Sequence, residues 1–305
     1  MTITLTGEND FAISKAEQQL ILSFVQKHGR HGLEKVDGET FDHREFSGLL
    51  QGVSLFAPAK LVIIKDLAKN KAAWEALPEW LDVVPEETTL VIIEPAPDKR
   101  TKTYKQLKSK SDFKEFNFVE GSSLIAWSQD FAKNIGGDLG RLEAQNLINR
   151  AGLDQWRLSS EIEKLVNYNP KIDLKNIELL VEPSADGNAF ELLDAAMSSN
   201  KIKVQSMINQ LKTEEDPYRF FGLLASQVHA LAVVSISGGK SADLIAKEAG
   251  LHPFVVRKSQ SLALKLGADK IKNVAAQVAQ CDRRLKSTGA DPWDLLSLTL
   301  QKIAA

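Results

Sequence analysis

Short apolar runs alternate with amphipathic stretches through residues 1–121. The runs are rich in β-branched residues and are bounded by glycine, proline or acidic residues, a pattern typical of strands. Strands are therefore predicted at 3–6, 61–64, 89–93 and 116–118, with helices between them, including 14–27 and 74–81. Near-continuous apolar runs favour a parallel sheet that is buried on both faces. The alternation of strands with helices predicts an α/β domain.

From residue 122 onward the strand signals fade and helical patterns follow one another. Helices are predicted at 124–135, 139–150 and 154–166, and then at 190–197, 201–211, 217–236, 241–249, 253–266, 271–286 and 293–303. Between the two groups, residues 169–188 are less regular and contain Pro170, Pro183 and Gly187, as is common at a domain boundary. We therefore expect three domains, at 1–121, 122–184 and 185–305.

The first predicted strand is followed by a glycine and then by a helix, which is how nucleotide-binding α/β domains usually begin. A phosphate-binding loop of that kind needs glycine amides and a lysine in the spacing G-x-x-x-x-G-K-[ST]. Here the turn is Gly7-Glu8-Asn9-Asp10-Phe11, which supplies two carboxylates and no lysine. The strand at 89–93 ends in Glu94-Pro95, without the acid pair of a metal site that activates water. The sequence predicts the architecture without the nucleotide chemistry.

Composition excludes several classes of protein. The chain of 305 residues has 38 Lys plus Arg and 40 Asp plus Glu, a formal net charge of -2, so any contact with DNA has to be local. The single cysteine, Cys281, excludes an intramolecular disulfide framework and suits a reducing cytosol. Residues 1–6 lack the basic and apolar regions of a signal peptide. The apolar stretch 220–236 is interrupted by polar residues and predicts a buried helix.

A Leu-Phe pair, Leu55-Phe56, is the sharpest functional clue in the chain. Upstream, apolar residues recur at the spacing of one helix face, at Phe46, Leu49, Leu50 and Val53. Because Pro58 disfavours continuation of that helix, the pair is expected at a helix end or on a tight loop. Two large apolar side chains in such a place either fill the core or bind a partner. From the residues alone, the core is the commoner fate of such side chains.

The only dense basic run lies at 98–110, where six basic residues accompany one acid. Lys99, Arg100, Lys102 and Lys105 belong to it and could contact nucleic-acid phosphates, which lysine and arginine do without reading sequence. The alternative is a solvated helix face, which is what charge runs more often form.

Other candidate sites carry less weight. Gly238-Gly239-Lys240-Ser241 resembles the end of a phosphate loop, but the preceding segment is helical, so a glycine linker with a serine cap explains it better. The five histidines show no metal-ligand spacing with carboxylates, and no nucleophile motif is present. Cys281 is expected to be a small core residue. No cofactor, metal or catalytic residue is therefore predicted.

A series of short motifs, in order along nearly the whole chain, resembles the delta subunit of the bacterial DNA polymerase III clamp loader. The motifs are Gly7 and Phe11, Ser54-Leu55-Phe56 followed by Lys60-Leu61-Val62-Ile63-Ile64, Asp98-Lys99-Arg100 with Tyr104-Lys105, Leu158 with Glu161-Ile162-Glu163-Lys164-Leu165, Phe190-Glu191-Leu192-Leu193-Asp194-Ala195, Ile245-Ala246 with His252-Pro253-Phe254 and Lys258, and Asp282 with Leu285-Lys286. Each motif is weak alone, and the specificity lies in their common order and spacing.

This resemblance implies an AAA+-like (RecA-like) parallel-sheet domain without a phosphate loop at 1–121, a small helical lid at 122–184 and a helical collar for oligomerisation at 185–305. It also implies that Leu55 and Phe56 insert into a hydrophobic pocket of the sliding clamp (beta) and open one clamp interface. Val53 and Ser54 are then expected to shape the helix end.

The mechanism that the resemblance implies is mechanical, with no ATP hydrolysis by this subunit. Its partners would be the sliding clamp, the ATPase subunits (gamma/tau) and delta prime through the collar, and primer-template DNA, in the cytoplasm. ATP bound by neighbouring subunits would expose the clamp-binding helix by favouring one of two states. Two alternatives stay open at this point: an active nucleotide-hydrolysing motor of similar architecture, and a stand-alone DNA-binding protein that uses the basic run.

Overall fold

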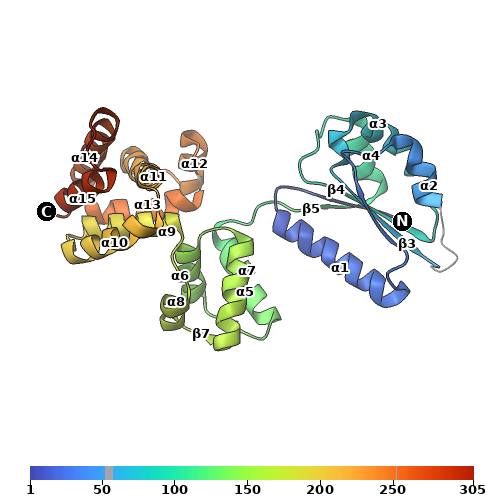
Figure 1. Cartoon of the computed structure of the whole chain (residues 1–305), viewed down its shortest axis with the longest axis horizontal. Coiled ribbons are helices and arrows are strands. Elements are labelled where there is room, and N and C mark those ends of the chain that lie inside the picture. Colours follow the sequence, from blue (N-terminus) through green and yellow to red (C-terminus); the bar gives the residue numbers. More distant parts are fainter. Residues whose placement is uncertain (52–57, 252) are drawn as a thin grey trace. The chain divides into compact units, whose positions relative to one another are not determined.

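The structure, a computed structural model, describes residues 1–51, 58–251 and 253–305 (Figure 1). It separates into two units, residues 1–119 and 120–305. The first unit is built on a sheet and the second is helical. The further division of the second part into 122–184 and 185–305 stays a prediction.

The first unit contains a five-stranded parallel sheet in the order β2-β3-β4-β1-β5. Its strands are β1 (Thr2–Thr6), β2 (Leu33–Asp37), β3 (Lys60–Lys65), β4 (Thr88–Glu94) and β5 (Asp112–Glu115). The predictions at 3–6, 61–64 and 89–93 are thus confirmed as β1, β3 and β4. Their runs are almost wholly buried, as expected for inner strands of a parallel sheet.

The two edge strands depart from the prediction. β2 was not expected, and the strand expected at 116–118 lies earlier, in β5. Both are partly exposed and carry charged residues, so neither has the apolar run that marks an inner strand. The N–H of Phe116 still donates to the carbonyl of Thr6 over 2.7 Å, but the chain leaves the sheet at that residue.

Helices cover both faces of this sheet. They are α1 (Asp10–His28), α2 (Phe46–Gln51), α3 (Lys71–Trp80) and α4 (Lys102–Lys110), with short 3-10 turns η1 (His43–Glu45) and η2 (Leu67–Lys69). On one face α1 packs through Ile13 on Leu5, Ile63 and Val91. On the other face lie α2, α3 and α4, as Figure 1 shows. Side chains alternate along each strand, which is why both faces are apolar.

The helical unit begins with α5 (Gly121–Asn134), α6 (Arg141–Ala151), α7 (Gln155–Tyr168) and α8 (Leu174–Leu180). Two very short strands, β6 (Asp138–Leu139) and β7 (Lys171–Ile172), pair in parallel between them. The span 169–188, expected to be irregular, therefore contains β7, α8 and the start of the next helix. Two-residue strands and a two-turn helix are too short for periodicity to reveal.

The remaining helices are α9 (Ala185–Met197), α10 (Lys201–Glu214), α11 (Pro217–Ile236), α12 (Ala242–Ala249), α13 (Pro253–Leu266), α14 (Ala268–Ser287) and α15 (Pro292–Ile303). Among the described residues, α11 alone is long and apolar enough to cross a membrane. It lies at the centre of this bundle, with Phe220 and Leu224 fully buried, so a core role accounts for its apolar character. Cys281 is buried in the same core, and burial raises the pKa of its thiol.

Candidate functional site

Helix α2, which leads toward the Leu-Phe pair, is fixed to the sheet by its apolar face. Phe46, Leu49 and Leu50 are buried, as their spacing predicts. The ring of Phe46 lies edge-on to Phe41, with centroids 4.9 Å apart, and stacks on Trp80 at 5.9 Å. Aromatic pairs in this geometry add to the stability that burial alone provides. The helix is therefore a rigid base for the residues that follow it.

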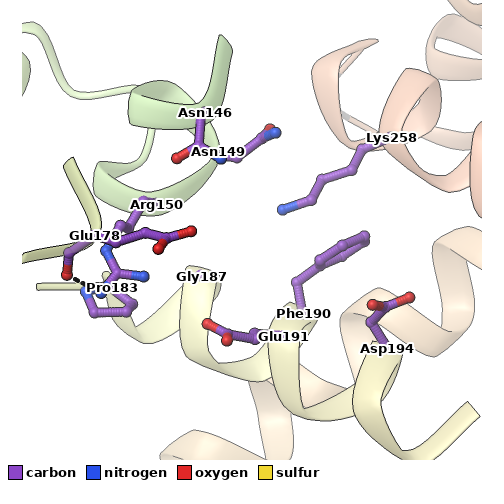
Figure 2. Close-up of a pocket in the computed structure, with 10 residues that line it drawn as sticks. All are labelled: Asn146, Asn149, Arg150, Glu178, Pro183, Gly187, Phe190, Glu191, Asp194 and Lys258. Carbon is purple, nitrogen blue, oxygen red and sulfur yellow. Dashed lines mark hydrogen bonds between the residues drawn. The ribbon is translucent and has the colours of Figure 1, made fainter. Parts of the chain in front are cut away.

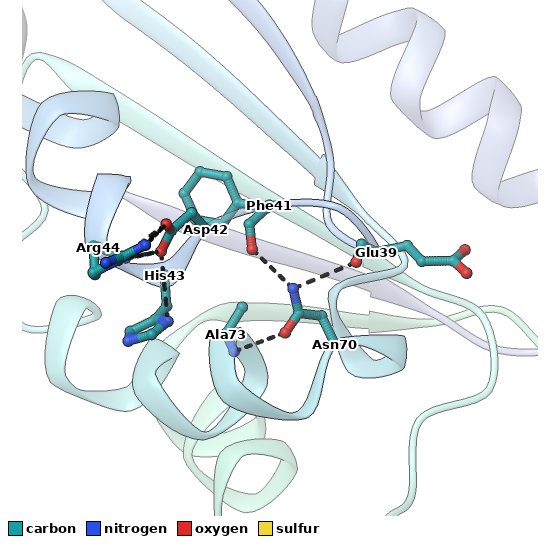
Figure 3. Close-up of polar contacts among 7 residues, drawn as sticks. All are labelled: Glu39, Phe41, Asp42, His43, Arg44, Asn70 and Ala73. Carbon is teal, nitrogen blue, oxygen red and sulfur yellow. Dashed lines mark hydrogen bonds and ion pairs between the residues drawn. The ribbon is translucent and has the colours of Figure 1, made fainter.

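The segment before α2 is held by hydrogen bonds to the start of α3 (Figure 3). The side-chain amide of Asn70 donates to the carbonyls of Phe41, over 2.8 Å, and Glu39, over 3.4 Å. The oxygen of the same side chain accepts from the N–H of Ala73 and so caps α3. Next to it, the carboxylate of Asp42 binds Arg44, and these hydrogen bonds lower the pKa of Asp42 to about 2. The approach to α2 is thus fixed as well.

The carboxyl end of α2 is bound by side chains from the sheet. The ammonium group of Lys60 donates to the carbonyl of Leu49 over 2.5 Å and forms an ion pair with Glu34 at 2.7 Å. The hydroxyl of Thr88 donates to the carbonyl of Leu50 over 3.2 Å. These contacts join the last described turn of α2 to the first residues of β3 and β4. The sequence analysis predicted no such role for Lys60 or Thr88. The feature that could have indicated it is a polar residue at the start of a strand whose next residues are apolar.

The predicted partner-binding residues themselves, Val53, Ser54, Leu55 and Phe56, lie outside the described residues. The described chain reaches Gln51 at the end of α2 and resumes at Pro58, two residues before β3. What the structure contributes is therefore the anchoring of the chain before and after the pair.

The turn between β1 and α1, where a nucleotide-binding domain would hold phosphates, is closed by the chain itself. The N–H of Gly7 donates to the carbonyl of Pro95, and that of Asn9 to the carbonyl of Phe116, both over 3.1 Å. The Asn9 side chain caps α1 by accepting from the N–H of Ala12 over 3.0 Å. Phosphate loops use glycine amides and the helix amino end for the ligand. Here these groups already have partners within the chain.

Gly7 shows how little space the turn leaves. Its φ is +116°, and a Cβ atom at this position would lie 2.0 Å from the carbonyl oxygen of Phe116. The backbone after β5 therefore lies directly against the turn.

A buried acid, Glu94, ends β4 at the same edge of the sheet. Its carboxylate accepts from the N–H of Ala68 over 2.9 Å. Burial raises its pKa to about 7, against the opposing effect of that hydrogen bond, and nearby Asp66 raises it further. Within the described ranges, no group of three or more acidic, histidine or cysteine side chains could hold a metal ion. Glu94 therefore caps η2 as a structural acid.

The basic run falls on the loop before α4 and on the exposed face of α4. Lys99 forms an ion pair with Glu115 at 2.7 Å, and Arg100 binds Asp98 at 2.8 Å. The hydrogen bonds that Asp98 accepts from the side chain and backbone of Arg100 lower the pKa of Asp98 to about 2. Lys102 and Lys105 are exposed and form no ion pair within the part of the chain that the structure describes. Two of the four predicted phosphate contacts are therefore already bound to acids.

The glycine-rich segment at 238–241 was interpreted either as the end of a phosphate loop or as a linker with a serine cap, and the structure favours the linker. Gly238 and Gly239 adopt positive φ, and the hydroxyl of Ser241 accepts from the N–H of Leu244 at the start of α12. A linker and a serine cap therefore account for it, as predicted.

Comparison with known families gives two matches. Residues 4–117 match the family model of the DNA polymerase III delta subunit, and residues 186–303 match that of the C-terminal domain of the same subunit. A comparison with curated proteins gives no match.

Among solved structures, the DNA clamp loader delta protein of Bacillus subtilis is similar, with 20% identity and a TM-score of 0.69 over 99% of this chain and 95% of that chain. A DNA polymerase III gamma subunit-related protein of Thermotoga maritima has 14% identity and a TM-score of 0.34, over 100% of this chain and 95% of that chain. The RuvB Holliday junction branch migration motor of Thermotoga maritima has 11% identity and a TM-score of 0.38, covering 86% and 78%. The first of these shows a shared fold.

Proposed function

The chain belongs to the DNA polymerase III delta subunit family, and from this premise we propose that it opens a sliding clamp by inserting Leu55 and Phe56 into a pocket of the clamp. The observation that carries the proposal is that the delta-subunit match, residues 4–117, includes the pair and both of its anchored flanks. A pair of large apolar side chains is the kind of compact anchor that dominates interfaces. Burial of both would contribute roughly 3–6 kcal/mol before ordering costs.

The anchoring of α2 supports this role physically. A binding loop loses less conformational entropy on association when the chain on either side of it is already fixed. Phe46 and Leu50 fix the helix before the pair, and Lys60, the first residue of β3 after it, binds the carbonyl of Leu49. Leu55 and Phe56 would thus follow a helix that is already fixed to the sheet.

The proposed subunit works without hydrolysing ATP. The turn at Gly7 supports this, because the N–H groups of Gly7 and Asn9 are bound within the chain and no lysine stands at the phosphate position. An active motor would need that turn to open and to supply a cation. ATP would instead act on neighbouring gamma/tau subunits and favour the state of the loader in which the clamp-binding pair is exposed.

The further partners follow from the same membership. We propose that residues 185–305 form a collar that assembles with gamma/tau and delta prime in the cytoplasm, and that 122–184 form the lid. Primer-template DNA would be met within that assembly. Contacts of Lys99, Arg100, Lys102 and Lys105 with its phosphates stay a prediction. The ion pairs of Lys99 and Arg100 argue against a stand-alone DNA-binding protein built on this run.

The test is the affinity of the purified chain for its cognate clamp, with Leu55→Ala/Phe56→Ala as the variant. We expect a loss of roughly a hundredfold or more in affinity without loss of folding. The matched control is Leu22→Ala/Phe118→Ala, which removes a leucine and a phenylalanine that are 60% and 64% exposed in the same unit. Equal affinity of the wild type and the Leu55/Phe56 variant would place the interface elsewhere, and absence of binding by the wild type, alone and in a reconstituted loader, would refute the proposal.

A further inference from the structure

A cavity of about 400 Å³ in the helical unit is lined by basic and neutral polar side chains. Three basic side chains line it, Arg141 from α6 and Arg257 and Lys258 from α13. Among its described lining residues none is acidic. The neutral part of the wall offers hydrogen-bonding groups, namely the hydroxyl of Ser122 and the side-chain amides of Gln145 and Asn149. Basic and neutral polar groups from three helices therefore converge on one space.

The guanidinium of Arg257 is held at the wall of this cavity. Its Nη2 donates to the carboxylate of Asp243 over 2.9 Å, which fixes the orientation of the group. Its Nη1 lies against Gly121, where a Cβ atom would be only 2.1 Å away. Gly121 has a φ of +55°, which a glycine adopts without strain. A side chain at 121 would thus displace the guanidinium from its position.

Arg141 brings a second guanidinium from a different element. It is the first residue of α6 and is exposed, and it forms no ion pair among residues 1–51, 58–251 and 253–305. Two planar guanidinium groups from different helices suit the oxygens of a tetrahedral anion better than two lysines would.

Lys258 also lines a second, smaller cavity, of about 230 Å³. Figure 2 shows its side chain reaching from α13 toward Phe190 of α9, and its Nζ lies 3.5 Å from the centre of that ring. The smaller cavity is also lined by Glu191 and Asp194, so its charge is mixed. Of these two cavities, the larger has basic but no acidic residues in its described lining.

We propose that the larger cavity binds a phosphate group, with the guanidinium groups of Arg141 and Arg257 as its main ligands. Such a group could come from the backbone of single-stranded DNA or from a free nucleoside triphosphate, since both present the same oxygens. The site lies in residues 120–305 and needs neither Leu55 nor Phe56. Its success or failure is therefore independent of the clamp-binding proposal.

The experiment is a titration of the isotope-labelled full chain with inorganic phosphate, followed through the backbone amide signals of Gly121 and Ser122. We expect saturable shifts, and the variant Arg141→Gln/Arg257→Gln should weaken the affinity by roughly tenfold or more. The matched control, Lys133→Gln/Lys265→Gln, removes two exposed cations from α5 and α13 outside the cavity and should leave the affinity unchanged. Displacement by oligothymidylate or by ATP then identifies which source binds more tightly.

A second variant guards against misfolding of the first. Ser122→Asp places a carboxylate at the cavity wall and leaves the pair of Arg257 with Asp243 in place, so it should also abolish the shifts. Absence of saturable shifts in the wild type would overturn the proposal. So would shifts that persist unchanged in both cavity variants.

Discussion

The two ends of the parallel strands form different contacts. The carboxyl edge of the sheet is the side on which the strands end, and the amino edge is the side on which they begin. At the carboxyl edge, the turn after β1 and the end of β4 bind other parts of the same chain, through Asn9 and Glu94. At the amino edge, Lys60 and Thr88 bind the last carbonyls of α2, and the chain then runs through residues 52–57 to β3. The carboxyl edge thus forms hydrogen bonds with other parts of the chain, while the contacts at the amino edge hold the described residues on both sides of 52–57.

This difference bears on where function lies in such a fold. Open α/β sheets ordinarily bind ligands outside the carboxyl ends of their strands. At that edge of this sheet, Gly7, Asn9 and Glu94 form hydrogen bonds with other parts of the same chain. The proposed clamp-binding pair uses the opposite edge. If both proposals hold, the sheet serves as a support for a binding segment at one edge, while the opposite edge has internal contacts where related folds bind ligands.

The largest expected effect tests how tightly the carboxyl edge is closed. Gly7→Ala would place a Cβ atom 2.0 Å from the carbonyl oxygen of Phe116, and its φ of +116° is unfavourable for any other residue. We expect a loss of roughly 4 kcal/mol in the free energy of unfolding, because both atoms in conflict are held by backbone geometry. Urea unfolding measures it.

The control for that variant has the same backbone problem without the contact. Gly29 has a φ of +77° and nothing within 4 Å of the Cβ position. Gly29→Ala should therefore cost only about 1 kcal/mol. Equal losses in the Gly7 and Gly29 variants would mean that the turn is not filled as described.

The second effect concerns the buried acid of the same edge. Burial raises the pKa of Glu94 from 4.5 to about 7, so the folded protein binds a proton that the unfolded chain has already released between these values. The contribution of Glu94 to stability is therefore present in full at low pH and is lost as pH rises to about 7. Relative to Glu94→Gln, the wild type should lose roughly 3 kcal/mol of unfolding free energy between about pH 4 and 8.

The comparison of the two proteins across pH removes the contribution of all other groups. A difference between wild type and Glu94→Gln that stays constant with pH would show that the pKa of Glu94 is the same in the folded protein as in the unfolded chain, so that the carboxyl group is ionised at neutral pH. The carboxyl edge would then be polar and hydrated, and the contrast between the two edges would weaken.

The inner strands of the sheet can be predicted from the sequence, because a strand that is buried on both faces contains a continuous run of apolar residues. β3 and β4 each contain a run of consecutive branched apolar residues, Leu61–Ile64 and Leu90–Ile93, and few helices of this size are apolar on every side. The edge strands β2 and β5 lack that mark, since one side of each meets solvent. Their pairing is decided by neighbours far away in the chain, which a local pattern does not contain.

The candidate sites also differ in how far a local sequence pattern predicts them. The density of charge at 98–110 is visible in the sequence, yet Lys99 and Arg100 are paired with acids in the fold. The proposed phosphate cavity has no local signature, because Arg141 and Arg257 come from helices far apart in the chain. Charge along a sequence is a poor guide to charge that converges in space. The prediction for Leu55 and Phe56 is untested by the described residues and depends on the family.

The smallest expected effect tests the amino edge. Lys60, whose side chain is only 12% exposed, binds both the carbonyl of Leu49 and the carboxylate of Glu34. Lys60→Met keeps the apolar stem and leaves those two acceptors without their cation, so we expect a loss of roughly 2 kcal/mol in unfolding free energy. Lys71→Met, at a lysine side chain that is 87% exposed, should change it by less than about 0.5 kcal/mol.

The same variant separates anchoring from simple stability. If the fixed end of α2 presents the clamp-binding pair, Lys60→Met should weaken clamp affinity by roughly tenfold under conditions where the chain stays folded. A variant that loses stability and binds the clamp as tightly as the wild type would show that residues 52–57 need no rigid base. The contacts of Lys60 at the amino edge would then contribute to the stability of the fold and play no part in binding the clamp.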